Sequence, residues 1–438
     1  MENMRLILAR LRSNAANLYA LTRDNPAQLW RMARALVLGH QKYRGYFLRP
    51  EHWRQGESEV RKRLVRNLMR NRGLRLQPVW KKNAIDVLVQ RSQGSMSHAA
   101  ATDKLNALTE KLDTKADVTE SYLAFAKACA SIGLFEGSYG FVRLASSRIE
   151  SDFESSSDLR VGMNAVRVAI HQQRADTARA RWGRLKDAKV PPGSRDGFDM
   201  LGIYMSVWNK ALVNPSQSHL SPEVRDWNAD IANKRILILG PTLANIDELR
   251  ADEYDFIAQI FRNRDLIQIP NRETGASREI LYVGGLYFEL KQLRREDLIA
   301  RFGRLRHFVI NAASSELGLP NTRRADSRLS SLFLRGTPNM IQVMCLDLLT
   351  AGAASLYVTG ANFYASSEPY AAGEQDGFEK FGFCCAIASH NPSENRAIIA
   401  NLVDAGVVSG DETFLSVLGL SDLEYLKLLD QYYGVPER

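Results

Sequence analysis

One stretch near the C-terminus decides the fold, LYVTGANFYASSEPYAAG at residues 356–373. We expect a short strand at 355–359 that stops at Gly360 and releases a polar loop carrying Tyr364 and Tyr370. Open α/β sheets form ligand crevices from such loops, at the carboxyl ends of their strands. The stretch therefore predicts an α/β sheet and marks the edge of that sheet where a ligand would bind.

A second strand and turn come earlier in the chain, in KRILILGPTLANIDEL at residues 234–249. The apolar run 235–239 predicts a buried strand, and a helix is expected near 244–250. The turn between them consists of Gly240, Pro241, Thr242 and Leu243. A glycine-containing turn before a helix presents free backbone N–H groups, which suit a phosphate. By itself this turn is weak support for a nucleotide site, because most strand–turn–helix units bind nothing.

Beyond residue 230 the chain has two histidines, His307 and His390. His307 enters an apolar run, which indicates a strand end with a structural role. His390 falls in ASHNPSENRAIIANL, where we expect a loop, a cap at Ser393 and a helix over 394–405. A histidine in a polar loop at a helix start can act as a general base at neutral pH.

Apolar runs and helical patterns alternate through the second half of the chain. We expect strands at 235–239, 254–260, 279–283, 306–311 and 355–359. We expect helices near 244–250, 287–302, 339–351, 394–405 and 421–432. This alternation predicts a mostly parallel sheet covered on both faces, that is, a Rossmann-like α/β domain.

The three stretches together resemble the bacterial sialyltransferases of glycosyltransferase family 42 and, more loosely, the eukaryotic sialyltransferases. The family has a strand, a G-P-S-L turn and I-D, then a strand ending in G-x-D-F-Y with a second Tyr six residues on, and a loop His before the last helix. The matching residues here are Gly240–Leu243, Ile246, Asp247, Gly360–Tyr364, Tyr370 and His390. The resemblance covers residues 232–410 and implies a sialyltransferase-like fold for this part.

The resemblance also implies a function. It is the inverting, metal-independent transfer of an acidic sugar from a CMP donor to a cell-surface glycan or lipid-linked glycan, without a cofactor. His390 would be the base, and the hydroxyls of Tyr364 and Tyr370 would donate hydrogen bonds to the leaving phosphate. The residues expected to bind substrate are Gly240, Pro241, Thr242, Asn263, Asn339, Gly360 and Asn362.

Three departures from the family pattern keep other interpretations open. Leu239 stands where the family has Asn, Asn362 stands where it has an acidic residue, and 337–340 lacks the family's glycine. A Kdo-type donor therefore fits as well as sialic acid. The alternative is a non-catalytic scaffold of polysaccharide assembly with a degenerate transferase domain. A different nucleotide-binding enzyme, such as a diphosphokinase or methyltransferase, is disfavoured because G-x-G-x-x-G and an acidic metal cluster are missing.

The first part of the chain is strongly basic. Residues 1–93 hold 20 Lys and Arg against 6 Asp and Glu, whereas the whole chain has a net charge of +9. Trp and Leu are interleaved with these charges, which suits an anionic membrane surface. A solvated basic face on a packed helical region is the alternative, and nucleic acid is disfavoured because no nucleic-acid-binding motif is visible.

The organisation predicted from the sequence has three parts. Residues 1–93 form a basic helical region, 105–230 a helical-repeat-like domain with its linker to the next domain, and 231–438 the sialyltransferase-like α/β domain. A small, polar linker is expected at 94–104. FVRLASSRI at 141–149 echoes WGRLKDAKV at 182–190. This echo suggests tetratricopeptide-like helix pairs, which commonly hold a protein partner.

Apolar runs and cysteines predict where the protein acts. No apolar run reaches the 18 residues of a membrane span, and the N-terminal stretch is a poor signal peptide. Four cysteines, Cys129, Cys345, Cys384 and Cys385, each sit among apolar residues without metal-ligand spacing. They indicate reduced, buried thiols. We therefore expect a cytoplasmic protein that lies peripherally at the inner membrane.

Overall fold

The computed structural model describes residues 78–110, 119–209, 222–242, 251–261, 278–284, 295–303, 305–311, 322–334, 336–367, 384 and 387–434. All of them belong to one compact unit, Arg61–Arg438. Asn263, Tyr370, the expected helix at 244–250 and residues 1–77 of the basic region lie outside the described residues.

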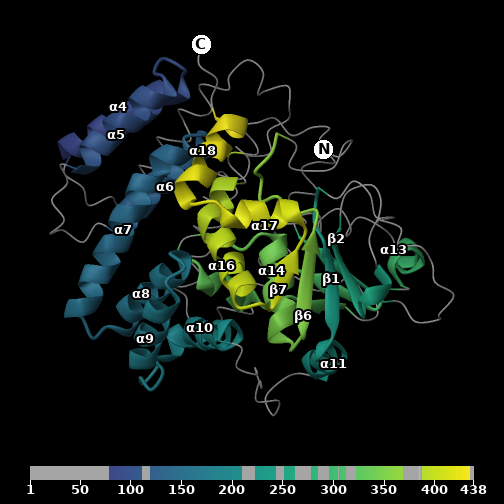
Figure 1. The fold of residues 1–438 in the computed structure, drawn as a ribbon. Coiled ribbons are helices and arrows are strands. Elements are labelled where there is room, and N and C mark those ends of the chain that lie inside the picture. Colours follow the sequence, from purple (N-terminus) through teal and green to yellow (C-terminus); the bar gives the residue numbers. More distant parts are fainter. Residues whose placement is uncertain are drawn as a thin grey trace, which may run out of the picture. The chain divides into compact units, whose positions relative to one another are not determined.

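The described residues form a parallel sheet of seven strands in the order β5-β4-β3-β2-β1-β6-β7 (Figure 1). The strands are β1 Arg235–Leu239, β2 Phe256–Ile260, β3 Glu279–Val283, β4 His307–Ile310, β5 Thr322–Arg324, β6 Ser355–Thr359 and β7 Val408–Gly410. Every neighbouring pair runs parallel. The predicted α/β class is therefore confirmed, and the five predicted strands are present, with β2 starting two residues later than expected.

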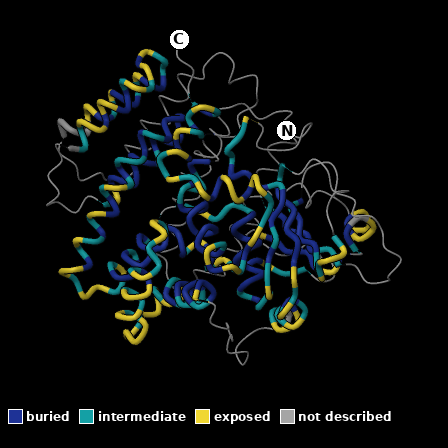
Figure 2. Tube along the Cα trace, viewed as in Figure 1, coloured by how far each residue is buried: buried dark blue, intermediate teal, exposed yellow. Residues whose placement is uncertain are grey.

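Apolar side chains cover the sheet on both faces, so the strands are mostly buried (Figure 2). On one face Ile236, Ile238 and Val358 join a large core with the helices α10 Arg195–Trp208, α14 Met340–Thr350 and α16 Pro392–Asp404. On the other face Leu281 and Phe308 pack with Leu298 and Phe302 of α13, Arg295–Phe302. This two-sided burial explains why the central strands are mostly apolar, with buried Gln259 in β2 as an exception.

Four of the five helices expected after β1 have counterparts among the described residues, with three differences from the prediction. The chain also forms α17 Glu412–Gly419 and α18 Asp422–Tyr433 after β1, and α11 Pro222–Ile231 before it. No helix was expected at 412–419. Ser393 does not cap α16: the N-cap is Asn391, with φ of 47° and no side-chain cap bond, and Pro392 occupies the first turn. Residues 387–390 are helical, so His390 ends a helical segment and does not lie in a loop.

The described residues before the sheet are helical. They form α4 Pro78–Ser92, α5 His98–Glu110, α6 Thr119–Ser131, α7 Phe135–Ser155, α8 Leu159–His171, α9 Ala175–Leu185 and α10. The linker expected at 94–104 is wrong in its second half, because α5 starts at His98 and buries Ala101 and Leu105 completely. Helices α6 and α7 pack together, as do α8 and α9. Their tetratricopeptide-like character stays a prediction.

The helical region and the sheet share one core. Phe135, Met163 and Tyr204 belong to the same apolar cluster as Ile236 and Ile398. The Tyr204 hydroxyl donates to the backbone oxygen of Ile398 at 3.1 Å. The predicted boundary at residue 231 stays a prediction, and the described residues on its two sides fold against each other.

Two further sequence expectations concern apolar helices and thiols. None of the described helices is long and apolar enough to span a membrane. Cys129, Cys345 and Cys384 are free and buried, as predicted, and Cys385 lies outside the described residues. Burial raises the pKa of the Cys129 and Cys345 thiols above the range in which they would ionise.

Candidate active site

The centre of the sheet contains a topological switch point. From β1 the chain builds outward through β2, β3, β4 and β5 on one side, whereas β6 and β7 lie on the other side. In open α/β sheets the ligand crevice lies outside the carboxyl ends of the strands at such a point. The turns that follow β1 and β6 are therefore the first place to look for a site, and they contain Gly240 and Gly360.

These two turns are in direct backbone contact. The Gly240 N–H donates to the Thr359 oxygen at 2.7 Å, and the Thr242 N–H donates to the Gly360 oxygen at 2.8 Å. A Cβ on Gly240 would lie 2.2 Å from the Gly360 oxygen, so no other residue fits there. Gly360 itself has φ of +66° and donates its N–H to the Asp411 carboxylate at 2.8 Å. The strands thus end in a rigid pair of turns.

The loop after β6 is held by its own side chains. Asn362 is buried, accepts the Tyr364 N–H on Oδ1 at 3.0 Å and donates from Nδ2 to Ser366 Oγ at 2.7 Å. Phe363 and Tyr364 adopt left-handed conformations with φ of 51° and 68°. Tyr425 donates to the Phe363 oxygen at 2.6 Å. The Asn362 amide therefore shapes the loop, and a half-buried Tyr364 follows it.

His390 lies against the segment that leads into α14. Its Nδ1 is 3.2 Å from the Thr337 backbone oxygen and 3.3 Å from Thr337 Oγ1. A carbonyl oxygen only accepts, so Nδ1 carries the hydrogen and Nε2 keeps its lone pair. Burial lowers the pKa of His390, and the charge of Lys127 lowers it further, against the raising effect of the Thr337 and Pro338 backbone. At neutral pH the ring is therefore a neutral base in a fixed tautomer.

One buried amide fixes the two segments around His390. Asn395 donates from Nδ2 to the Thr337 oxygen at 3.2 Å and to the His390 oxygen. Its Oδ1 accepts the Asn339 N–H at 2.9 Å. Gln342 in turn donates to the Asn395 backbone oxygen at 3.0 Å. Sequence reasoning missed Asn395, whose only signal is that a polar residue stands among the inward-facing positions of a helix.

Asn339 has a local role in the described structure. Its Oδ1 accepts the N–H groups of Ile341 at 3.0 Å and Gln342 at 3.3 Å, so it caps α14. The cap bonds satisfy two of the donors that a helix start would otherwise offer to an anion. The segment before Asn339 faces the carboxyl edge, because α14 returns the chain to the start of the parallel strand β6.

The predicted site residues thus form two groups at one edge of the sheet. Gly240, Thr242 and Gly360 contact one another, and the loop of Asn362 and Tyr364 continues from them. The second group consists of His390, Thr337 and Asn339, held by Asn395. Both reach the carboxyl edge because α14 and α16 each precede a parallel strand of the same sheet.

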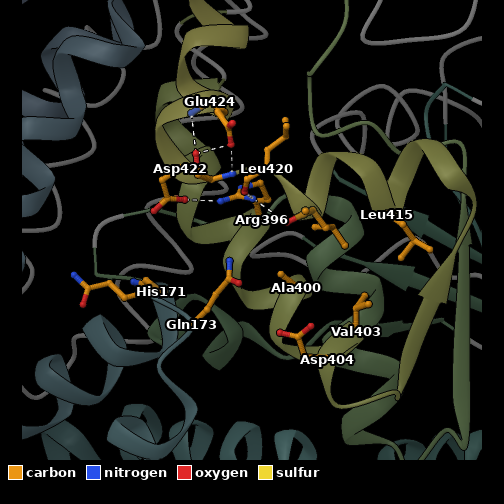
Figure 3. A pocket seen from close by; sticks show the side chains of 14 residues that line it. His171, Gln173, Arg396, Ala400, Val403, Asp404, Leu415, Leu420, Asp422 and Glu424 are labelled. Atoms are coloured by element: carbon orange, nitrogen blue, oxygen red, sulfur yellow. Dashed lines mark hydrogen bonds and ion pairs between the residues drawn. The ribbon is translucent and has the colours of Figure 1, made fainter.

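A cavity of about 590 Å³ lies elsewhere, between the end of α8, α16 and the α17–α18 corner (Figure 3). Arg396 projects toward it and is bound to the Leu418 oxygen at 2.9 Å and to Asp422 at 2.6 Å. Asp404, Asp422 and Glu424 also line it. Three carboxylates beside one already paired arginine would repel a nucleotide phosphate, so this cavity is not the donor site that the sequence predicts.

Comparison of the chain with models of protein families, with curated proteins and with solved structures finds no match. The function therefore has to be argued from the residues and the geometry of the carboxyl edge.

Proposed function

We propose that this chain is a glycosyltransferase that moves an acidic sugar of the sialic acid or Kdo type from a CMP donor to a glycan acceptor. The observation that carries the proposal is the His390 ring, which burial keeps neutral and which Thr337 holds through Nδ1 just before α16. A base in a fixed tautomer is what an acceptor hydroxyl needs, because such a hydroxyl hardly ionises at neutral pH.

The proposed reaction has one chemical step. The acceptor oxygen attacks the anomeric carbon of the sugar from the face opposite the phosphate, and the bond to the phosphate oxygen breaks, so the configuration inverts. Nε2 of His390 takes the acceptor proton, and the Thr337 oxygen stabilises the charge that the imidazolium gains. CMP leaves with the electron pair of the broken bond. Hydroxyl donors are needed at its phosphate, and Tyr364 and Tyr370 are assigned to it by the family resemblance.

Nucleotide binding gives the first test. CMP should raise the melting temperature of the full chain, because a ligand of the folded state stabilises it by RT ln(1 + [L]/Kd), about 2.7 kcal/mol at 100 times Kd. AMP serves as the matched control and should give a much smaller shift. Equal shifts with the two nucleotides, or no shift with CMP, would contradict a cytidine donor site.

The scaffold remains the second candidate, and specific observations favour it. Leu239 is completely buried, so it offers no polar group where the family has Asn. The side chains of Asn339 and Asn362 are used for a helix cap and a loop turn. A scaffold would bind a polysaccharide or an assembly partner without CMP, so the nucleotide test also separates the two candidates.

The basic region gives the protein a proposed location at the cytoplasmic face of the inner membrane. The net charge of residues 1–93 is carried by 20 Lys and Arg against 6 Asp and Glu. We expect the full chain to co-sediment with vesicles that contain anionic lipid and to remain in solution with neutral vesicles, because charge attraction drives this binding. The same sedimentation with both kinds of vesicle would contradict the electrostatic contact.

A further inference from the structure

Three helices distant in the chain bring three potential metal ligands to one point. His98 begins α5, Glu136 lies in the first turn of α7, and Asp430 lies in the last turns of α18. Nε2 of His98 is 3.3 Å from Oδ2 of Asp430 and 3.6 Å from Oε2 of Glu136. One ligand atom from each residue lies within 4.8 Å of the other two. We refer to these residues as the three-helix cluster.

The two separations from His98 within the three-helix cluster fit a tetrahedral zinc ion. Zinc bonds of about 2.0–2.1 Å to nitrogen and oxygen place neighbouring ligand atoms about 3.3–3.5 Å apart. The separations of 3.3 Å and 3.6 Å from His98 match this range with only small adjustments. An imidazole and two carboxylates are also ligands that zinc accepts.

The carboxylate of Asp430 is oriented before any ion arrives. Its Oδ1 accepts the Phe135 N–H at 2.6 Å and its Oδ2 accepts the Glu136 N–H at 2.7 Å. Each carboxylate oxygen has two acceptor positions, so these bonds leave one on each oxygen for a metal. Hydrogen bonds of this kind to a ligating carboxylate are the usual outer partners that fix a metal site.

The charge of the three-helix cluster and its exposure to solvent both favour a bound cation. Two carboxylates carry a charge of −2 when both are ionised, which a divalent cation balances. Lys427 Nζ is 3.8 Å from Glu136, but it approaches Oε1 and not the oxygen that faces His98. The side chains of His98 and Glu136 are 23% and 26% exposed and that of Asp430 is 9% exposed, so the cluster lies close to solvent, which can supply a water as the fourth ligand.

We propose that His98, Glu136 and Asp430 bind one zinc ion, completed by a water molecule. The ion crosslinks α5, α7 and α18 and so joins the helical region to the last helix after the sheet. This site is independent of the proposed transfer reaction, since none of its residues belongs to the carboxyl edge. An ion pair between a protonated His98 and the two carboxylates is the competing explanation of the same contacts.

Zinc binding to the chelator-treated full chain tests the proposal. Isothermal titration should give one zinc per chain, and Co²⁺ in its place should give the intense visible absorption of a tetrahedral site. His98→Ala should abolish binding. Glu136→Gln should weaken it at least tenfold while keeping the fold, because its side chain is partly exposed and is nearly isosteric. Lys427→Ala, which removes a nearby charge but no ligand, should bind zinc as tightly as the unchanged chain or more tightly.

The outcomes separate the zinc site from the ion pair. Zinc should raise the melting temperature of the unchanged chain and of Lys427→Ala, but not that of His98→Ala. The absence of stoichiometric binding by the unchanged chain would overturn the proposal. Unchanged affinity in Glu136→Gln and His98→Ala would overturn it as well, because the ion would then lie elsewhere.

Discussion

The carboxyl edge of the sheet and the three-helix cluster use their polar groups in opposite ways. At the edge, Asn339 and Asn362 are bonded within their own segments, and Asn395 joins two segments. One imidazole, that of His390, is held by Thr337 through Nδ1, with Nε2 left as an acceptor. In the cluster, an imidazole and two carboxylates point at one another. The first arrangement suits the proposed proton transfer, and the second suits the proposed cation.

The largest expected effect comes from a substitution at the carboxyl edge. His390→Ala removes the proposed base, so the rate of sugar transfer should fall by roughly 10²–10⁴, while the CMP-induced shift in melting temperature persists. Burial lowers the pKa of His390, so the unchanged chain should keep its rate of sugar transfer down to a pH below 6.5 and lose it as the ring takes up a proton.

Ser393→Ala is the matched control for this substitution. Ser393 stands near His390 at the start of α16, and the helix has no side-chain cap bond that the change would remove. It should transfer sugar at the unchanged rate. Full activity of the His390→Ala protein would end the mechanism, whatever the nucleotide test shows.

Metal removal should have a smaller effect, which changes the melting temperature but not the transfer rate. Treatment with EDTA should lower the melting temperature by a few degrees if zinc crosslinks the three helices, because a ligand at 100 times its Kd contributes about 2.7 kcal/mol. Well below the melting temperature the transfer rate should not change, since no step of the proposed reaction uses a metal. A rate that needs added Mg²⁺ or Mn²⁺ would contradict the assigned chemistry of the carboxyl edge.

The smallest expected effect concerns Glu394, which shares the first turn of α16 with Asn395. Burial raises its pKa to about 8, while the backbone of Leu334 and the charge of Arg167 lower it. The unfolded carboxyl ionises near 4.5, so the folded state holds an extra proton between pH 4.5 and 8 and stability falls as pH rises through this window. Burial lowers the pKa of neighbouring His171 to about 3, which gives the opposite slope between pH 3 and 6.5.

Above pH 6.5, Glu394 is therefore the member of this pair that makes the stability of the fold depend on pH. The free energy of unfolding of the unchanged chain should fall by on the order of 1–2 kcal/mol between pH 6.5 and 8 through Glu394, and Glu394→Gln should remove this fall. Denaturant unfolding of both proteins at the two pH values measures it, with Asp404→Asn, an exposed carboxylate of the same helix, as the control. An equal decline in Glu394→Gln and in the unchanged chain would show that the buried carboxyl is not protonated at neutral pH.

Much of the sheet could be predicted because its strands are buried on both faces. The runs at β1, β3 and β6 are apolar and end at a glycine or a polar residue, which is a local signal. The strands β5 and β7 were missed because TRR and VSG are three-residue strands without an apolar run. They form only because Phe308 and Leu356 of a neighbouring strand offer them a backbone partner.

The candidate site was predictable only in part, for a similar reason. His390 and the glycine turns stand out in the sequence, whereas Asn395 acts through contacts with Thr337 and Asn339, more than fifty residues away. The predicted cap at Ser393 was wrong because Asn391 takes a left-handed conformation that lets Pro392 start the helix. The linker at 94–104 was misjudged because small residues such as Ala101 also let helices approach closely.

The sequence by itself determined the α/β class, most of the central strands, the edge at which their turns meet and the basic character of residues 1–93. These features depend on periodicity, glycine turns and composition, which are local properties of the chain. The tertiary structure alone decided the contact of His390 with Thr337, the burial of Glu394 and the convergence of His98, Glu136 and Asp430. Each of these depends on burial or on a partner distant in the chain, and no local pattern encodes either.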